Sequence, residues 1–107
     1  MRCVFSLLTT NTLRTLTCVP QVSSAIRQGI PVAVGAGNDQ QDASNFSPAR
    51  VAGAITVGAT TRDDTFASSF SNFGDKVNIL APGVDIVSAS HLDDHTNVIK
   101  SGTSQAT

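Results

Sequence analysis

The stretch IPVAVGAGND, residues 30–39, decides the fold that we expect for this chain. Its first half is a continuous apolar run with β-branched residues, the pattern of a strand buried on both faces of a parallel sheet. Before it, Val22, Ala25 and Ile26 recur at helical spacing, and Gly29 is a common residue just after a helix. A helix, a glycine and a buried strand make half of a βαβ unit, so the sequence predicts an α/β fold.

Short apolar runs recur through the rest of the chain, with turn-rich polar stretches between them. They predict a mainly parallel sheet with few helices and a strand-rich second half. Since both faces of a parallel sheet are normally covered, the shortage of helices predicts a fold that is incomplete at both ends. Residues 1–20 show no clear period and receive no assignment, while residues 21–107 are expected to form one partial domain. The further strands are expected in residues 54–59, 77–83, 85–90 and 97–101.

The composition of the chain limits its size and its partners. Its 107 residues, with 40% hydrophobic residues and a formal net charge of −1, suffice for one modest domain. No block of Lys or Arg indicates a nucleic-acid or membrane partner, and no run approaches the ~20 apolar residues of a membrane span. The first residues, MRCVFSLL, make a poor signal peptide because no convincing cleavage site follows. Cys3 and Cys18 fit no metal-binding spacing and are interpreted as incidental thiols.

The motif GAGN, residues 35–38, allows more than one interpretation. A dinucleotide-binding loop would need a third glycine at position 40 and a helix after it, but Gln40 and a turn-rich stretch follow. Small residues at the end of a strand can instead leave room for a ligand chain against the backbone. Asn38 would then direct an amide with two donors into the opening, where such a group can stabilise a developing oxyanion. Taken alone, however, Asn38 in this motif is more typical of a local Asx-turn cap.

The last residues, SGTSQAT (101–107), have the pattern of a strand end, a glycine and the first turn of a helix. A serine there lies beside unpaired backbone N–H groups and the positive end of the helix dipole, which favour an anionic tetrahedral intermediate. Its small neighbours would give a substrate carbonyl access to the hydroxyl. Taken alone, the motif is more typical of a plain helix cap formed by Thr103 or Ser104.

Together, the motifs GAGN, SFSNFG, APG and SGTSQAT, in this order, resemble the C-terminal part of the catalytic domain of the subtilisin-like serine proteases. The similarity is greatest to the secreted, proteinase K-like branch and covers about residues 22–107. It implies that Ser104 is the nucleophile and Asn38 the oxyanion-hole amide, with the Ser104 backbone N–H as second donor. The resemblance also implies a pocket for the substrate side chain before the scissile bond, lined by Gly35, Ala36 and Gly37.

The resemblance further implies a serine endopeptidase that acts on peptides or proteins and, at full length, is extracellular. Residues 21–107 would then be part of its catalytic domain, which breaks off at the nucleophile. Asn78 stands where many relatives have an aspartate that binds calcium together with main-chain carbonyls near Ala52 and Ala54. Since calcium prefers charged oxygen ligands, we expect a weakened calcium site, no metal and no other cofactor. Gln105 replaces the methionine that usually follows the nucleophile.

The catalytic aspartate and histidine of the family have no counterpart in the sequence. Both precede the oxyanion asparagine in the family, and residues 1–37 contain neither Asp nor His. His91 and His95 could supply a base, or bind a metal with Asp93 and Asp94, but their acidic, loop-like context favours a solvated loop.

We therefore expect a fragment of a serine endopeptidase with little activity of its own, because a serine without a base is a poor nucleophile. Residues 1–20 are interpreted as a misjoined start rather than native enzyme sequence. The alternative function is a non-catalytic fragment that binds extended peptides by strand addition.

Overall fold

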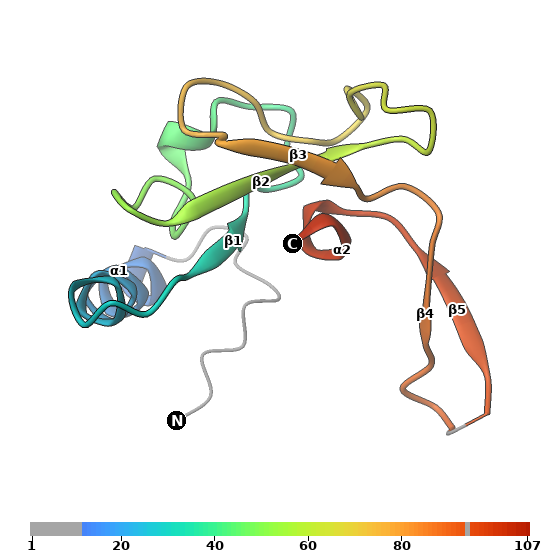
Figure 1. Cartoon of the computed structure of the whole chain (residues 1–107), viewed down its shortest axis with the longest axis horizontal. Helices are drawn as coiled ribbons and strands as arrows, with labels where there is room; N and C mark the ends of the chain where they lie inside the picture. The colour runs from blue at the N-terminus through green and yellow to red at the C-terminus, as the bar shows by residue number, and fades with distance from the viewer. Residues whose placement is uncertain (1–11, 94) are drawn as a thin grey trace.

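The structure, a computed structural model, describes residues 12–93 and 95–107. It contains a small parallel sheet, a long helix, a short C-terminal helix and a hairpin that projects away from the sheet (Figure 1). The elements in chain order are α1 (Thr12–Arg27), β1 (Ala33–Gly35), the 3₁₀ turn η1 (Ala43–Asn45), β2 (Ile55–Thr60), β3 (Ile79–Pro82), β4 (Ile86–Ala89), β5 (Asn97–Lys100) and α2 (Thr103–Ala106).

The first three strands form a parallel sheet in the order β1-β2-β3, so that β2 lies in the middle. Val34 pairs with Thr56 and Val57 with Ile79. β4 and β5 form a separate antiparallel pair in which Val87 lies opposite Ile99. The predicted α/β fold, with a mainly parallel sheet and few helices, is confirmed, and β2 to β5 begin and end close to the expected ranges.

The prediction for the first strand was wrong in one respect. We expected the run that begins at Ile30 to be buried on both faces, but Ile30 is 53% exposed and β1 has only three residues, of which Ala33 is exposed. β2 is instead the strand with a continuous buried stretch, over residues 56–60. The reason is position, because β2 is flanked by a strand on each side and β1 on only one side among the described residues.

Helix α1 begins at Thr12, inside the range that the sequence left without an assignment, and Pro20 lies within it. A proline inside a helix costs about 3 kcal/mol, since it removes a backbone donor. Burial of aliphatic side chains, at about 1.5–3 kcal/mol each, offsets this cost. On α1 these side chains are Val19, Val22 and Ile26, which pack in one cluster with Val32, Val34, Val51 and Ala54. Gly29 follows the helix with φ +81°, as its sequence position predicted.

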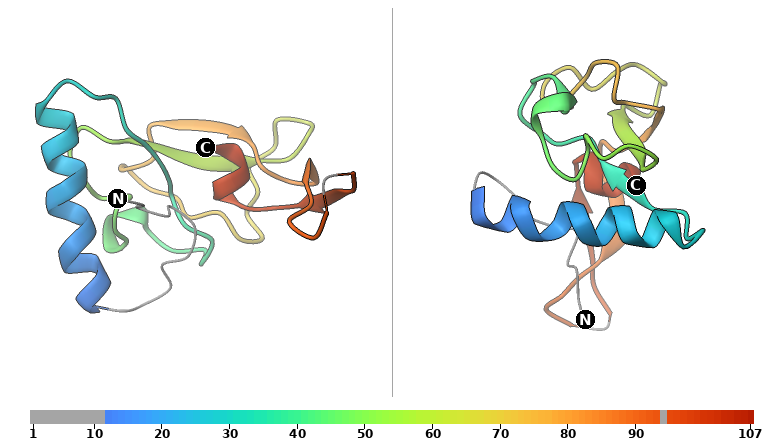
Figure 2. Two further views of the ribbon diagram at one scale, coloured as in Figure 1. Left: turned by 90° about the horizontal axis from the view of Figure 1, so that it is seen from below. Right: turned by 90° about the vertical axis from the view of Figure 1, so that its left-hand side faces the viewer.

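Helix α2 lies against all three strands of the parallel sheet, on the other side of β1 from α1 (Figures 1 and 2). A second apolar cluster, formed by Ala36, Ala43 and Ala49 with Phe46 and Val77, supports the loop that follows β1. The segment at the end of β1 is thus packed against this cluster, while β1 also contacts α2. In the described part of the chain, neither helix has the length and apolar character needed to cross a membrane.

Candidate active site

The carboxyl end of β1 meets the start of α2. The Ala36 N–H donates to Val57 O at 2.8 Å, which extends the sheet one residue past β1. The next N–H, of Gly37, donates to Thr103 Oγ1 at 3.2 Å, and the Thr103 N–H donates to Asn38 Oδ1 at 2.9 Å. Two hydrogen bonds between residues 66 and 65 positions apart therefore join the strand end to the helix start.

Glycines allow α2 to come this close. A Cβ atom on Gly35 would lie 2.9 Å from Thr103 Oγ1, and one on Gly83 would lie 2.7 Å from Gly102 O. Gly102 also donates its N–H to Gly83 O at 2.7 Å. Gly35 of the GAGN motif and Gly83 of the APG motif are thus required by the close approach of the α2 segment to the ends of the strands.

Ser104 lies in the first turn of α2 and is exposed. The interpretation of Thr103 and Ser104 as plain helix caps was wrong, because the N-cap residue is Gly102 and no side chain caps the helix. The Asx-turn interpretation of Asn38 was also wrong, since its Oδ1 bonds to Thr103 rather than to its own loop. The structure thus brings Asn38 and Ser104 to the same edge, since the N–H that Asn38 accepts belongs to Thr103, the residue directly before Ser104.

The Asn38 side chain is oriented by this bond. With Oδ1 held by the Thr103 N–H, Nδ2 is left with both of its N–H donors, and it has no acceptor among the described residues. Asn38 is also exposed, so its donors are accessible from outside. Gly35 and Gly37 beside it are half-buried, and Ala36 is fully buried with its side chain in the second apolar cluster. Ala36 can therefore line a pocket only through its backbone.

Sequence reasoning gave no role to Asn72, a fully buried asparagine in the SFSNFG motif. Its side chain makes hydrogen bonds to the backbone of Ala36, Asp39 and Gln41, on both sides of Asn38. The motif itself was the only signal in the sequence, because neither the burial of Asn72 nor its partners can be read from local spacing.

The two histidines lie in the loop that joins β4 and β5. Figure 1 shows this loop at the end of the hairpin that points away from α2. His91 and His95 are exposed, and the His95 N–H donates to Asp93 Oδ1 at 2.9 Å. The pKa of Asp93 lies below its usual value, first because the Thr96 side chain bonds to it and then because of the His95 and Thr96 backbone N–H groups.

The loop holds no metal site among the residues described. Asp94 lies outside those residues, and within 12–93 and 95–107 no group of three His, Cys, Asp or Glu side chains could hold a metal ion. The solvated-loop interpretation fits the exposure of His91, Asp93 and His95.

Asn78, at the position of the expected calcium ligand, is bonded to β2. Its Oδ1 accepts from the Thr56 N–H at 2.8 Å, and its own N–H donates to Thr56 O at 2.9 Å. The amide oxygen is uncharged and already engaged, whereas calcium prefers several charged oxygens. Asn78 therefore offers a calcium ion neither a charged oxygen nor an unengaged one.

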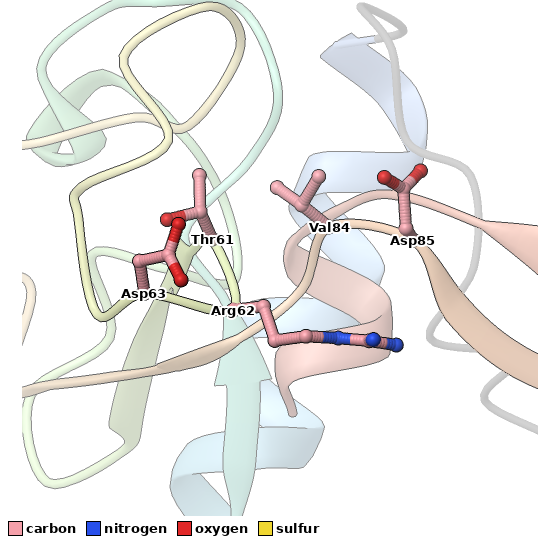
Figure 3. Close-up of a pocket in the computed structure, with 5 residues that line it drawn as sticks. All are labelled: Thr61, Arg62, Asp63, Val84 and Asp85. Carbon is pink, nitrogen blue, oxygen red and sulfur yellow. The ribbon is translucent and has the colours of Figure 1, made fainter.

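A hollow of about 350 Å³ opens beyond the carboxyl ends of β2 and β3 (Figure 3). It is lined by Thr61, Arg62, Asp63, Val84 and Asp85. Neither Asn38 nor Ser104 lines it, so the two predicted site residues lie outside this hollow.

Comparison with known proteins relates this arrangement to one family. The model of the subtilase family matches residues 9–107 of the chain. Subtilisin-like protease 1 of Pseudogymnoascus destructans is 52% identical over 86 residues, which are 80% of this chain and 21% of that protein. The extracellular serine proteinase of Thermus sp. is 50% identical over 86 residues, with the same shares of 80% and 21%.

A solved structure supports the same relation. The crystal structure of a cold-adapted subtilisin-like serine proteinase matches with a TM-score of 0.76 at 45% identity, over 81% of this chain and 31% of that one. The chain spans about a fifth of the length of the curated relatives that it matches.

Proposed function

Because the chain belongs to the subtilase family, we propose that it carries the nucleophile and the oxyanion hole of a serine endopeptidase that cleaves peptides or proteins. The observation that carries the proposal is the bond between Asn38 Oδ1 and the Thr103 N–H at 2.9 Å. This bond ties the side chain of Asn38 to Thr103, the residue before Ser104. The reaction needs the Asn38 amide and the Ser104 hydroxyl at one substrate carbonyl.

In the proposed reaction, Ser104 Oγ attacks the carbonyl carbon of the scissile peptide bond and loses its proton to a base. The electron pair of the C=O bond moves to the oxygen, which becomes an oxyanion. Asn38 Nδ2 and the Ser104 backbone N–H donate to that oxygen. Since the Asn38 Oδ1 is held by α2, its donors need no reorientation as the charge develops. The substrate side chain before the scissile bond would lie against the backbone of residues 35–37.

The base comes from outside these 107 residues in this proposal. Both histidines of the sequence lie in the exposed β4–β5 loop, at the far end of the hairpin from α2. We therefore expect the 107-residue chain alone to have little or no activity. For the whole enzyme we propose an extracellular location, in line with the name of the Thermus relative, an extracellular serine proteinase.

The proposal is tested in a hybrid enzyme, in which the 86 matched residues replace their counterparts in the Thermus extracellular serine proteinase. We expect the hybrid to hydrolyse a chromogenic peptide anilide and to react with a fluorophosphonate probe at Ser104. Ser104→Ala should abolish both, and Asn38→Ala should lower kcat by about 10²–10³-fold, the loss that subtilisin itself shows without this donor.

Ser101→Ala is the matched control, since Ser101 lies three positions away and its hydroxyl bonds to the Asp85 N–H rather than to the site. It should leave kcat within about twofold of the parent hybrid. A folded hybrid that fails to cleave the anilide would contradict the proposal, and so would rapid labelling of Ser104 in the isolated chain. If the isolated chain binds peptides without cleaving them, and the hybrid is folded but inactive, the peptide-binding alternative is favoured.

A further inference from the structure

Both polar atoms of the Asn72 side chain form hydrogen bonds with the backbone of the segment that contains Asn38. Its Nδ2 donates to Ala36 O at 3.0 Å, and its Oδ1 accepts from the Asp39 N–H at 2.9 Å and the Gln41 N–H at 3.0 Å. Its backbone N–H donates to Gly37 O at 2.9 Å. The backbone groups in these four bonds flank Asn38 in the sequence, since two belong to residues before it and two to residues after it.

Asn72 is itself linked to β2 through the hydroxyl of Ser71. The hydroxyl of Ser71 donates to Asn72 O at 3.1 Å and accepts from the Ala59 N–H, also at 3.1 Å. Asn72 and Ser71 are both almost fully buried. A buried amide whose donor and acceptor are both satisfied resists rotation, because any other orientation would leave polar groups without partners.

The fit between Asn72 and the loop is also close. Gly37 has φ +106°, and a Cβ atom at this position would lie 2.4 Å from Asn72 Nδ2. The loop passes over the Asn72 amide with no room for a side chain between them. The position of the backbone at Gly37 is therefore set by Asn72.

We infer that Asn72 is a positioning residue of the proposed active site: it fixes the backbone on both sides of Asn38 and thereby aims the oxyanion donor. Two sets of hydrogen bonds then position Asn38. Those from Asn72 hold the backbone on both sides of Asn38, and the Thr103 N–H holds the side-chain oxygen of Asn38. The inference rests on the proposed function, since Asn72 acts only through Asn38.

The test is a double-mutant cycle in the hybrid enzyme, with kcat expressed per active site titrated by the fluorophosphonate. Asn72→Asp keeps the shape and the acceptor oxygen but replaces the donor to Ala36 O by a second oxygen, which repels it. We expect kcat to fall about 10–100-fold with KM nearly unchanged, because the displaced donor acts only in the transition state. In the Asn38→Ala background the same change should lower kcat by no more than about twofold.

The control is Thr56→Val, which removes a buried hydroxyl that donates to Ala49 O and makes no hydrogen bond to residues 36–41. It should leave kcat per titrated site unchanged. Equal losses from Asn72→Asp with and without Asn38 would overturn the inference while leaving the proposed function in place, and so would a raised KM at constant kcat. A parent hybrid that is folded but inactive would overturn the proposed function, and the positioning role with it.

A second measurement needs no variant. In the 107-residue chain, the amide protons of Asp39 and Gln41 should exchange with solvent at least about 100-fold more slowly than in an unstructured peptide, because both are bonded to a fully buried side chain. If these two protons exchange at the unstructured rate while that of Val57 in β2 is protected, Asn72 does not hold the segment and the inference is overturned.

Discussion

Two regions of this molecule carry polar groups that are typical of active sites, and they differ in the range of the hydrogen bonds that position them. At the end of β1, the bonds that position residues 36–41 reach partners 21 to 66 positions away in the chain. In the loop between β4 and β5, Asp93 bonds only to residues two and three positions away. The first region is built by the tertiary fold, while the second is a local turn.

The difference shows that residue type alone does not locate a site. The loop contains two histidines and two aspartates, groups that suit acid–base or metal chemistry, yet His91, Asp93 and His95 are exposed and Asp93 bonds only to near neighbours. The strand end contains glycines, an alanine and an asparagine, and it is there that separate elements converge. Catalytic groups need fixed geometry, which long-range contacts provide.

The largest effect is expected from filling the space at the strand end. Gly37→Ala puts a Cβ 2.4 Å from Asn72 Nδ2, at a φ of +106°. We expect a loss of about 2–4 kcal/mol in the free energy of unfolding of the 107-residue chain, measured by urea denaturation. Gly29→Ala is the matched control, because Gly29 has φ +81° but no atom within 4 Å of the added Cβ. It should cost about 1 kcal/mol, the backbone strain alone. Equal losses at the two glycines would mean that the strand end is not closely packed.

Much of the fold could be predicted because its signals are local. Apolar runs bounded by turn residues gave β2 to β5, and Gly29 gave the end of α1. The start of α1 could not be predicted, since Pro20 argues locally against a helix and only packing on Val34 and Val51 supports one. The degree of burial also misled us, because it is β2 and not β1 that lies in the middle of the sheet.

The candidate site divides in the same way. Motif order brought out Asn38 and Ser104, although their proximity is a property of the fold. Thr103 and Asn72 were missed as partners, because a hydroxyl and an amide give no sign in the sequence of which distant backbone groups they will meet. The roles of Ser104, Asn38 and residues 35–37 stay predictions until the hybrid enzyme is assayed.

A smaller effect is expected at Asn78, which is also held over a long range, by Thr56 at 22 positions. Asn78→Ala leaves the buried Thr56 N–H without its acceptor and should lower the free energy of unfolding by about 1–3 kcal/mol. Since the amide is engaged and uncharged, neither calcium nor a chelator should change the melting temperature of the parent chain. A melting temperature that rises with added calcium would show that this bond is replaced by the ion.

The local turn should contribute less, and in a pH-dependent way. The pKa of Asp93 is lowered by the hydrogen bonds from Thr96 and His95. The carboxylate therefore stays ionised to a lower pH in the folded chain than in the unfolded chain, where its pKa is 3.8. Its stabilising effect is therefore present above pH 3.8 and is lost as the pH falls through the lowered pKa. Asp93→Asn should reduce stability at pH 7 and have a smaller effect at pH 3, measured by urea denaturation. Asp75→Asn is the control, since Asp75 accepts no hydrogen bond from another described residue; an identical pH profile for both variants would contradict the assignment.

The smallest effect, none at all, is expected from removing the imidazoles. In the hybrid enzyme, replacing both His91 and His95 by Ala should leave kcat and KM unchanged, because the loop lies at the far end of the hairpin from α2 and its side chains are exposed. Ser104→Ala is the positive control, since it should abolish hydrolysis in the same assay. A fall of more than about tenfold in kcat in the double variant, equivalent to about 1.4 kcal/mol, would mean that the hairpin folds back onto the strand end and supplies the base. The contrast between a region held by distant partners and one held by near neighbours would then no longer separate the active site from the loop.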